Sequence, residues 1–416
     1  MNTLSPEHIA VTAEQDHDVI YSQLGSLAMG EERTDRLQLV RPYTPEDMSR
    51  PDRDGKRSVR LEFTNDTATT IDVYTYGPWD RINDPKNPAW PVVHWSGTPS
   101  SAKGQTALSN GELDFTDIAW CGIQKPGYGG SERLPGRIIA DGATILEGVA
   151  GALGLSHCSV VGRSGGAPYA EACYAELPNL VVNGAFFNSM APKGLVAAQG
   201  VYDGWSKDFT EQNERAYNAK TPEQWLEQAL AFRRQSRELE DDMFIVIEDA
   251  IKNACSADQK LMRGWTRRRL GVAESHVHAL QGEGYWGRFD DVVAQAQYDW
   301  GFYVGKARRP GLFVQGDVDK ITPGHHLWSL VAPISPNLVT TAVIGGEGHF
   351  YTLDMVRGVV FGLTLNGRRT VYEGEQRSLR QDMVPFFRGW QDDYNTRPTI
   401  RFRDRTGSHD AHLVAM

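Results

Sequence analysis

The sequence predicts an α/β fold, in which a mainly parallel β-sheet carries helices on both faces and accommodates one inserted helical segment. Short apolar runs that suit buried strands alternate with helix-period stretches between residues 91 and 191. The alternation lapses over residues 192–309, which are rich in helix formers and charged side chains. The strand pattern resumes at residues 311–315 and 338–344. A single sheet with a helical insertion explains this order of patterns.

The expected elements begin with two half-buried strands. Residues 58–63 and 71–76 both alternate apolar and polar side chains, and Asn65 and Asp66 between them suit a turn. Between the later strands, one helix is expected to end at Gly154, because glycine is a common helix stop. The later strands and helices of the first half are expected at residues 91–95, 117–123, 138–153 (helix), 159–162, 167–177 (helix) and 180–183.

The inserted segment has a clear helix start of its own. Thr221 is a suitable N-cap, Pro222 suits the first helical position, and Glu223 favours the first turn. The chain is therefore divided into five parts. They are an N-terminal extension that packs loosely or serves as an arm (1–56), a first part of the core (57–191), a helical cap (192–309), a second part of the core (310–367) and a C-terminal extension with a helix around residues 384–390 (368–416).

Composition excludes several classes of protein. The formal net charge of −10 argues against a nucleic-acid-binding surface, which is normally basic. Residues 1–23 are polar and acidic, unlike a signal peptide, and no apolar run is long enough to span a bilayer. The cysteines show no Cys-x-x-Cys pairing, so free thiols in a reducing cytoplasm are expected. We therefore expect a cytoplasmic protein that binds a small molecule, not nucleic acid or a membrane, with terminal extensions that leave room for self-association. The cysteines are Cys121, Cys158, Cys173 and Cys255.

The strongest chemical signal is Ser164. It stands between Gly162 and Gly166, directly after an expected strand and directly before an expected helix. A strand that turns sharply into a helix holds its corner residue in a strained conformation, so the neighbouring positions must be nearly bare. The corner presents its hydroxyl at the carboxyl edge of the sheet, near the positive end of the following helix. This pattern predicts a nucleophilic serine.

A nucleophilic serine requires a base, and the base requires an orienting acid. Asp317 and Asp319 both follow the expected strand at 311–315, and His349 follows the strand at 338–344. A nucleophilic serine at a strand–helix corner is followed along the chain first by the acid and then by the histidine, each at the end of a strand. This sequence has that order. His349 is the predicted base and Asp319 the predicted acid. Asp317 is the competing candidate, and an acid on a neighbouring strand is the third alternative.

Over residues 92–363 the sequence resembles the α/β-hydrolase superfamily with a helical cap. Residues 126–131 resemble the turn that follows that family's fourth strand, and Gly-x-Ser-x-Gly resembles its nucleophile elbow. The resemblance implies a catalytic triad of Ser164, Asp319 and His349. It also implies an oxyanion hole from the backbone N–H groups of Thr98 and Gly165.

One departure from the family concerns the loop that carries Thr98. Relatives usually have His-Gly-x-Pro there, whereas this chain has Ser96-Gly97-Thr98-Pro99 and places His94 two positions upstream. The glycine and the following N–H group are retained. An oxyanion hole is therefore still expected.

The resemblance also narrows the reaction. Dehalogenases and epoxide hydrolases of this fold use an Asp nucleophile, and prolyl-type aminopeptidases tend to have a bulky aromatic residue where this chain has Gly165. We therefore expect a cofactor-free serine hydrolase of carboxylesterase type, acting on a small ester, lactone or thioester through an acyl-serine. The alternatives are a lyase, cyclase or acyltransferase of secondary metabolism, favoured only by the altered loop at Ser96, and a non-catalytic binding protein on the same fold.

Other residue clusters favour structural roles. The pairs His276/His278 and His325/His326 lack the i, i+4 spacing with a nearby carboxylate that a zinc site needs, so no metal is expected. No Gly-x-Gly-x-x-Gly follows a first strand, so no dinucleotide cofactor is expected. Arg267–Arg269 are read as a solvated helix face, with a contact to an anionic substrate in the cap as the alternative. The tryptophans of the inserted segment are read as its core, with one or two lining the acyl pocket: Trp205, Trp225, Trp265 and Trp286.

Overall fold

The structure is a computed structural model. The structure describes residues 19–25, 29, 33–103, 116–196, 215, 218–264, 266–350, 352–374, 379, 381–383 and 400–403.

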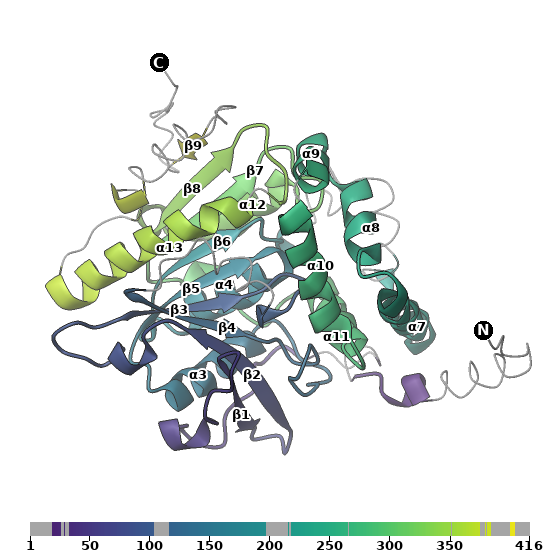
Figure 1. The fold of residues 1–416 in the computed structure, drawn as a ribbon, viewed down its shortest axis with the longest axis horizontal. Coiled ribbons are helices and arrows are strands. Elements are labelled where there is room, and N and C mark those ends of the chain that lie inside the picture. The colour runs from purple at the N-terminus through teal and green to yellow at the C-terminus, as the bar shows by residue number, and fades with distance from the viewer. Residues whose placement is uncertain are drawn as a thin grey trace, which may run out of the picture.

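Nine strands of the described chain form one sheet in the order β1-β2-β4-β3-β5-β6-β7-β8-β9 (Figure 1). All neighbouring pairs from β4 to β8 are parallel, whereas β1–β2, β2–β4 and β8–β9 are antiparallel. The predicted mainly parallel sheet is therefore confirmed. The strands are β1 (Lys56–Glu62), β2 (Ala68–Tyr76), β3 (Trp90–Trp95), β4 (Ile118–Ile123), β5 (Cys158–Arg163), β6 (Val181–Phe187), β7 (Gly311–Gly316), β8 (Val339–Ile344) and β9 (Ile400–Arg403).

Both faces of the sheet are covered, which explains why the central strands read as continuous apolar runs. Strand β3 is buried at every position. Its Val92 belongs to an apolar cluster with Leu363 of α13, and its Val93 belongs to a second cluster with Ala143 of α3 and Ala170 of α4. The helices are α3 (Asp141–Leu153), α4 (Ala167–Glu176), α5 (Lys193–Val196), α7 (Pro222–Asp241), α8 (Ile245–Asn253), α9 (Ser256–Gly264), α10 (Thr266–Leu280), α11 (Tyr285–Ala296), α12 (Gly324–Val331) and α13 (Thr352–Arg368).

The predicted helix ends are confirmed at both tested positions. Helix α3 ends at Gly154, whose φ of 70° is the left-handed conformation that glycine adopts without steric cost. Helix α7 begins after Thr221, whose side chain accepts a hydrogen bond from the backbone N–H of Gln224, and Pro222 occupies the first turn. None of the described helices is both long and apolar enough to cross a lipid bilayer.

Helices α7 to α11 follow one another between β6 and β7, and we call them the helical segment α7–α11. Figure 1 shows them together at one side of the sheet, with α10 and α11 drawn nearer to the strands than α7 and α8. The segment has an apolar cluster of its own, which includes Ile251, Met262 and Val272. Phe350, from the loop after β8, also belongs to this cluster. The segment is thus packed against the loop that carries the predicted histidine.

The expectation that residues 1–56 pack loosely or serve as an arm is wrong for residues 33–43. Arg33 forms an ion pair with Asp141 at the start of α3, and the backbone N–H of Leu37 donates to the same carboxylate at 2.8 Å. The backbone of Leu39 pairs with that of Phe63 in an isolated antiparallel β-bridge, and the Tyr43 side chain is buried. The physical reason is that the Asp141 side chain is fully buried and needs donors, which this segment supplies.

The C-terminal residues add a strand that the sequence analysis did not predict. Strand β9 pairs with β8, with Thr341 opposite Arg403. In addition, Asn366 of α13 donates to Asp382 at 3.0 Å and accepts from Asn183 of β6 at 3.1 Å. The tail is therefore bonded to the sheet through buried polar groups. The helix expected around residues 384–390 lies outside the described residues.

Glu171 on α4 gives a testable pH dependence. Its side chain is fully buried, and burial raises its pKa to about 8, against a smaller opposing effect of Ser189. The unfolded chain releases this proton near pH 4.5, whereas the folded protein keeps it until about pH 8. Folding therefore becomes less favourable as pH rises through that window, by up to about 1.4 kcal/mol per pH unit.

Glu171→Gln removes this ionisation, so the variant should gain stability over wild type as pH rises from 5 to 8. Denaturant unfolding at several pH values measures the difference. Glu147→Gln on α3 is a suitable control, because the Glu147 side chain is half exposed. A constant difference between Glu171→Gln and wild type at every pH would contradict the prediction.

Candidate active site

Ser164 occupies the corner between β5 and α4. Its φ is 50°, a conformation that residues other than glycine rarely adopt. The flanking glycines are required by close packing, because a Cβ atom at Gly162 would lie 2.6 Å from the Cα atom of Ala167. A Cβ atom at Gly166 would lie 2.2 Å from the carbonyl oxygen of Ser96. The predicted strained turn is therefore present.

The structure brings Ser164, His349 and Asp319 into one chain of hydrogen bonds. The Ser164 hydroxyl lies 2.9 Å from Nε2 of His349, and Nδ1 of His349 lies 2.8 Å from a carboxylate oxygen of Asp319. The three residues follow the carboxyl ends of β5, β8 and β7. Asp317 is exposed and accepts a hydrogen bond from the backbone N–H of Gly346 instead. Of the two acids considered, Asp319 is the one beside the imidazole.

The environment of Asp319 keeps its carboxylate ionised. It accepts backbone N–H groups of Ile321 at 2.7 Å and Thr322 at 3.0 Å, and the Thr322 hydroxyl at 2.9 Å. Burial raises its pKa, but the adjacent His349 and these donors outweigh burial and lower the pKa overall. An ionised carboxylate beside Nδ1 favours the tautomer with its proton on Nδ1. Nε2 is then free to accept a proton from a serine hydroxyl.

Asp258, at the start of α9, is a site residue that sequence reasoning missed. Its carboxylate oxygens accept the backbone N–H groups of His349 and Phe350, each at 2.7 Å. Glycine is required at position 348, because a Cβ atom there would lie 2.0 Å from a carboxylate oxygen of Asp258. On the other side, the Asn188 amide donates to the His349 carbonyl at 2.9 Å. No local motif marks Asp258, because its partners lie far away in the chain.

Thr98 and Gly165, the two residues predicted to supply N–H donors, lie beside each other next to the serine. A Cβ atom at Gly97 would lie 3.3 Å from Cβ of Ser164, so the loop after β3 touches the corner. A Cβ atom at Gly165 would lie 2.3 Å from the Thr98 hydroxyl oxygen. His94, which the departure from the family pattern places on β3, stacks on Trp120 in the sheet core, and burial lowers its pKa to about 3.

Two of the other described histidines have structural partners. Nδ1 of His326 accepts the backbone N–H of Ala191 at 3.0 Å, and His278 lies 2.8 Å from the Ser101 hydroxyl. His276 is buried, and burial lowers its pKa to about 3. Among the described residues, no group of three or more potential metal ligands comes together.

The other predicted groups are only partly described. Trp225 and Trp286 are buried in the largest apolar cluster, as expected for core residues. Arg269 forms an ion pair with Glu248 between α10 and α8. Trp265 lies outside the described residues, as do Trp205 and the side chains of Arg267 and Arg268.

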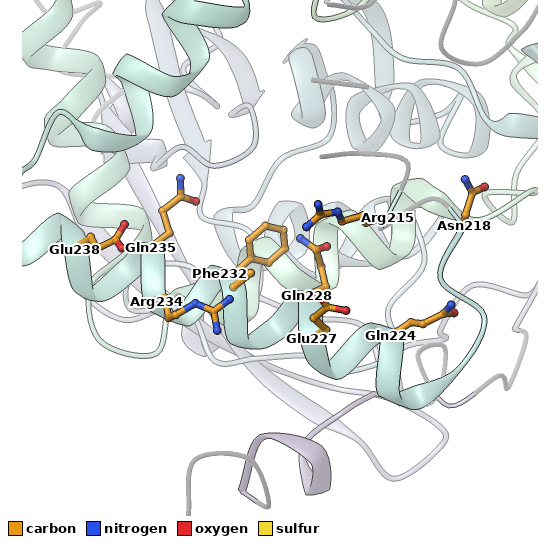
Figure 2. A pocket seen from close by; sticks show the side chains of 10 residues that line it. Arg215, Asn218, Gln224, Glu227, Gln228, Phe232, Arg234, Gln235 and Glu238 are labelled. Carbon is orange, nitrogen blue, oxygen red and sulfur yellow. The ribbon is translucent and has the colours of Figure 1, made fainter. Parts of the chain in front are cut away.

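A pocket of about 590 Å³ lies along α7 (Figure 2). Figure 2 shows Arg215, from the chain before this helix, turned toward Gln228 and Phe232. Most of the other lining side chains are polar or charged. Ser164, His349 and Asp319 do not line this pocket, so it is separate from the hydrogen-bonded chain.

No family model and no curated protein sequence matches the chain. Solved structures do match. An esterase from Thermogutta terrifontis is 16% identical with a TM-score of 0.50, and the match covers 79% of this chain and 99% of the esterase. An esterase from Exiguobacterium antarcticum is 15% identical with a TM-score of 0.50, covering 74% of this chain and 98% of the other.

A third similar structure is an α/β hydrolase enzyme from a deep-sea metagenome library. It is 15% identical with a TM-score of 0.50, and the match covers 74% of this chain and 96% of that enzyme. At such identities the likeness establishes the fold alone. The order of the strands and these structural matches agree, and the chain has the α/β-hydrolase fold.

Proposed function

We propose that the protein is a cofactor-free serine hydrolase that cleaves a small carboxylic ester, lactone or thioester through an acyl-serine intermediate. The observation that carries the proposal is the hydrogen-bonded chain from Ser164 through His349 to Asp319, with Ser164 held at a strained corner. A serine–imidazole–carboxylate chain of this kind activates a hydroxyl for attack on an acyl carbon.

The first half of the proposed reaction transfers the acyl group to the protein. Nε2 of His349 takes the Ser164 proton while the hydroxyl oxygen attacks the acyl carbon, and the carbonyl π electrons move to the carbonyl oxygen. The N–H groups of Thr98 and Gly165 stabilise the resulting oxyanion. The protonated imidazole then gives its proton to the leaving oxygen or sulfur. The bond between that atom and the acyl carbon breaks. An ester or thioester then gives an acyl-serine and a free alcohol or thiol, whereas a lactone gives an acyl-serine that carries the new hydroxyl.

The second half returns the protein to its starting state. A water molecule takes the position of the leaving oxygen or sulfur beside His349. His349 removes a proton from this water as the water oxygen attacks the acyl-serine. Collapse of this second intermediate breaks the bond to the Ser164 oxygen. The carboxylic acid leaves, and the proton on His349 returns to Ser164. Asp319 stabilises the imidazolium in both halves without taking its proton.

The proposal assigns the helical segment α7–α11 the role of a cap that covers the acyl pocket and sets acyl size. Contacts of this segment with the loops of His349 and Thr98 support it, since Asp258 of α9 bonds to the first and Asp291 of α11 to the second.

The proposal also places the protein in the cytoplasm. All four cysteines are buried free thiols, as expected for a reducing compartment. A disulfide-bonded form recovered from the culture medium of the producing cell would contradict this part of the proposal.

Labelling with a fluorophosphonate probe tests the proposed function, together with hydrolysis of p-nitrophenyl esters of increasing acyl length. Wild type should be labelled and should hydrolyse at least the short esters, whereas Ser164→Ala should do neither. Ser156→Ala is the matched control, because Ser156 is an exposed serine just before the other end of β5. Labelling without turnover would favour a non-hydrolytic enzyme on this fold. A wild type that is not labelled would favour a binding protein.

A further inference from the structure

A fully buried ion pair lies directly behind the Gly97–Thr98 loop. Lys125, from the turn after β4, contacts Asp291 of α11, and neither side chain has exposed surface. We propose that Lys125, Asp291 and Gln295 are positioning residues that hold the two N–H groups of the proposed oxyanion hole in place, and that Lys125 also polarises the Thr98 N–H group. The inference rests on the proposed function, and it assigns part of that site to the last helix of the segment α7–α11.

Asp291 is the centre of this arrangement. One carboxylate oxygen accepts the Lys125 ammonium, the Thr98 hydroxyl at 2.7 Å and the Tyr128 hydroxyl at 2.9 Å. The other accepts Arg137 and the Tyr169 hydroxyl, each at 2.8 Å. Burial raises the pKa of Asp291, but Lys125 and Arg137 outweigh burial and hold it at about 2. Asp291 therefore remains a charged, saturated acceptor at every working pH.

Lys125 joins this carboxylate to the loop backbone. Its ammonium donates to Asp291, to the Thr98 hydroxyl at 2.8 Å and to the Gly97 carbonyl at 3.3 Å, which uses all three of its hydrogens. The Gly97 carbonyl and the Thr98 N–H belong to the same peptide group. A cation on the carbonyl draws electrons through the amide and makes the N–H a stronger donor, because hydrogen bonds in a chain polarise one another. Lys125 thus acts on the Thr98 N–H group, one of the two donors of the proposed oxyanion hole.

Gln295 positions Gly165. The carbonyl that it contacts shares its peptide group with the N–H of Gly166, so Gln295 holds the Gly165 backbone in place without polarising the Gly165 N–H group. It follows Asp291 by one helical turn, so both side chains leave the same face of α11. Its amide nitrogen donates to the Gly165 carbonyl at 3.2 Å and to the Thr98 hydroxyl at 3.4 Å. The Thr98 hydroxyl therefore accepts hydrogen bonds from Gln295 and Lys125 and donates one to Asp291, so protein groups satisfy it fully. One face of α11 therefore fixes both loops that supply the proposed N–H donors.

A merely structural role would be that these residues fasten α11 to the sheet. The two roles differ in what they do to the oxyanion. A thiono ester carries the developing negative charge on sulfur, a larger and weaker hydrogen-bond acceptor than oxygen. A well-positioned pair of N–H donors therefore favours the oxo ester over the thiono ester. Loss of positioning reduces that preference, whereas general destabilisation lowers both rates equally.

The test compares hydrolysis of p-nitrophenyl acetate and its thiono analogue by wild type, Lys125→Met and Gln295→Leu. We expect kcat for the oxo ester to fall about 10- to 100-fold with KM nearly unchanged, since deleting a whole oxyanion donor costs about 10²- to 10³-fold. The thiono rate should fall much less. Arg33→Met is the matched control, because it removes the cation from the buried Asp141 without touching the site.

Each outcome decides between the alternatives. A reduced oxo-to-thiono ratio in the variants, but not in Arg33→Met, supports the inference. Equal losses on both esters, or no loss, overturn it while the proposed function stands. If Lys125→Met does not fold, Gln295→Leu decides, because it buries no unpaired charge. If wild type itself is neither labelled by fluorophosphonate nor active, the proposed function fails and this inference fails with it.

Discussion

His349→Ala should lower kcat for aryl esters by about 10⁶-fold, the loss expected when the base of a serine–histidine–acid unit is removed. The physical reason is that a serine hydroxyl is a poor nucleophile unless a base 2.9 Å away accepts its proton. The imidazole is also the group that protonates the leaving alcohol, so both halves of the proposed reaction lose their proton carrier. Initial rates with p-nitrophenyl acetate, measured at high enzyme concentration, would check this.

A matched control for this variant is His157→Ala. His157 precedes the opposite end of β5 from Ser164 and hydrogen-bonds to Tyr372 at 3.0 Å. It should retain the rate of wild type. If His349→Ala also kept that rate while folding normally, His349 would not be the base, and the proposed mechanism would be wrong.

Asp319→Asn should lower kcat by about 10⁴-fold and leave KM nearly unchanged. The asparagine carbonyl can still accept the backbone N–H groups of Ile321 and Thr322, so the loop should keep its shape. In that arrangement the amide NH₂ would face Nδ1 of His349. A donor there favours the tautomer with its proton on Nε2, which cannot accept the proton of Ser164. Steady-state kinetics over a range of ester concentrations separates kcat from KM.

Asp317→Asn provides the comparison, because Asp317 is two residues away, exposed and bonded to Gly346 rather than to the imidazole. It should behave as wild type does. The reverse result, a large loss for Asp317→Asn and none for Asp319→Asn, would transfer the acid's role to Asp317.

The parts of the fold and site that the sequence predicted depend on local signals. Gly154 ends α3 because glycine tolerates a positive φ. Thr221 begins α7 because its hydroxyl accepts the backbone N–H of Gln224, three residues further along the chain. Ser164, Asp319 and His349 each follow a recognisable apolar strand. Since parallel strands end at one edge of a sheet, their positions in the chain were sufficient to predict that they meet.

The parts that the sequence did not predict depend on contacts between distant residues. Asp258 lies 91 residues from His349, and Lys125 lies 166 residues from Asp291. The residues next to an aspartate in a helix, or next to a lysine in a turn, do not indicate whether that charged side chain is buried. The prediction for the N-terminal residues was wrong for a related reason. These residues are poor in apolar clusters, so the sequence shows nothing that would fix them against the core. They are held in place by hydrogen bonds that they donate to the buried Asp141, which becomes their neighbour only in the folded protein.

The contacts of α9 and α11 have a consequence for how such a protein can be re-engineered or diversify. Asp258 bonds to the loop of His349, and Gln295 bonds to both Gly165 and Thr98. The helical segment α7–α11 is therefore not an interchangeable module. A chimera that replaced it with the equivalent segment of another protein would remove partners from two loops at once, even if the grafted helices folded well. New specificities are better sought by substituting individual side chains while those two helices are retained.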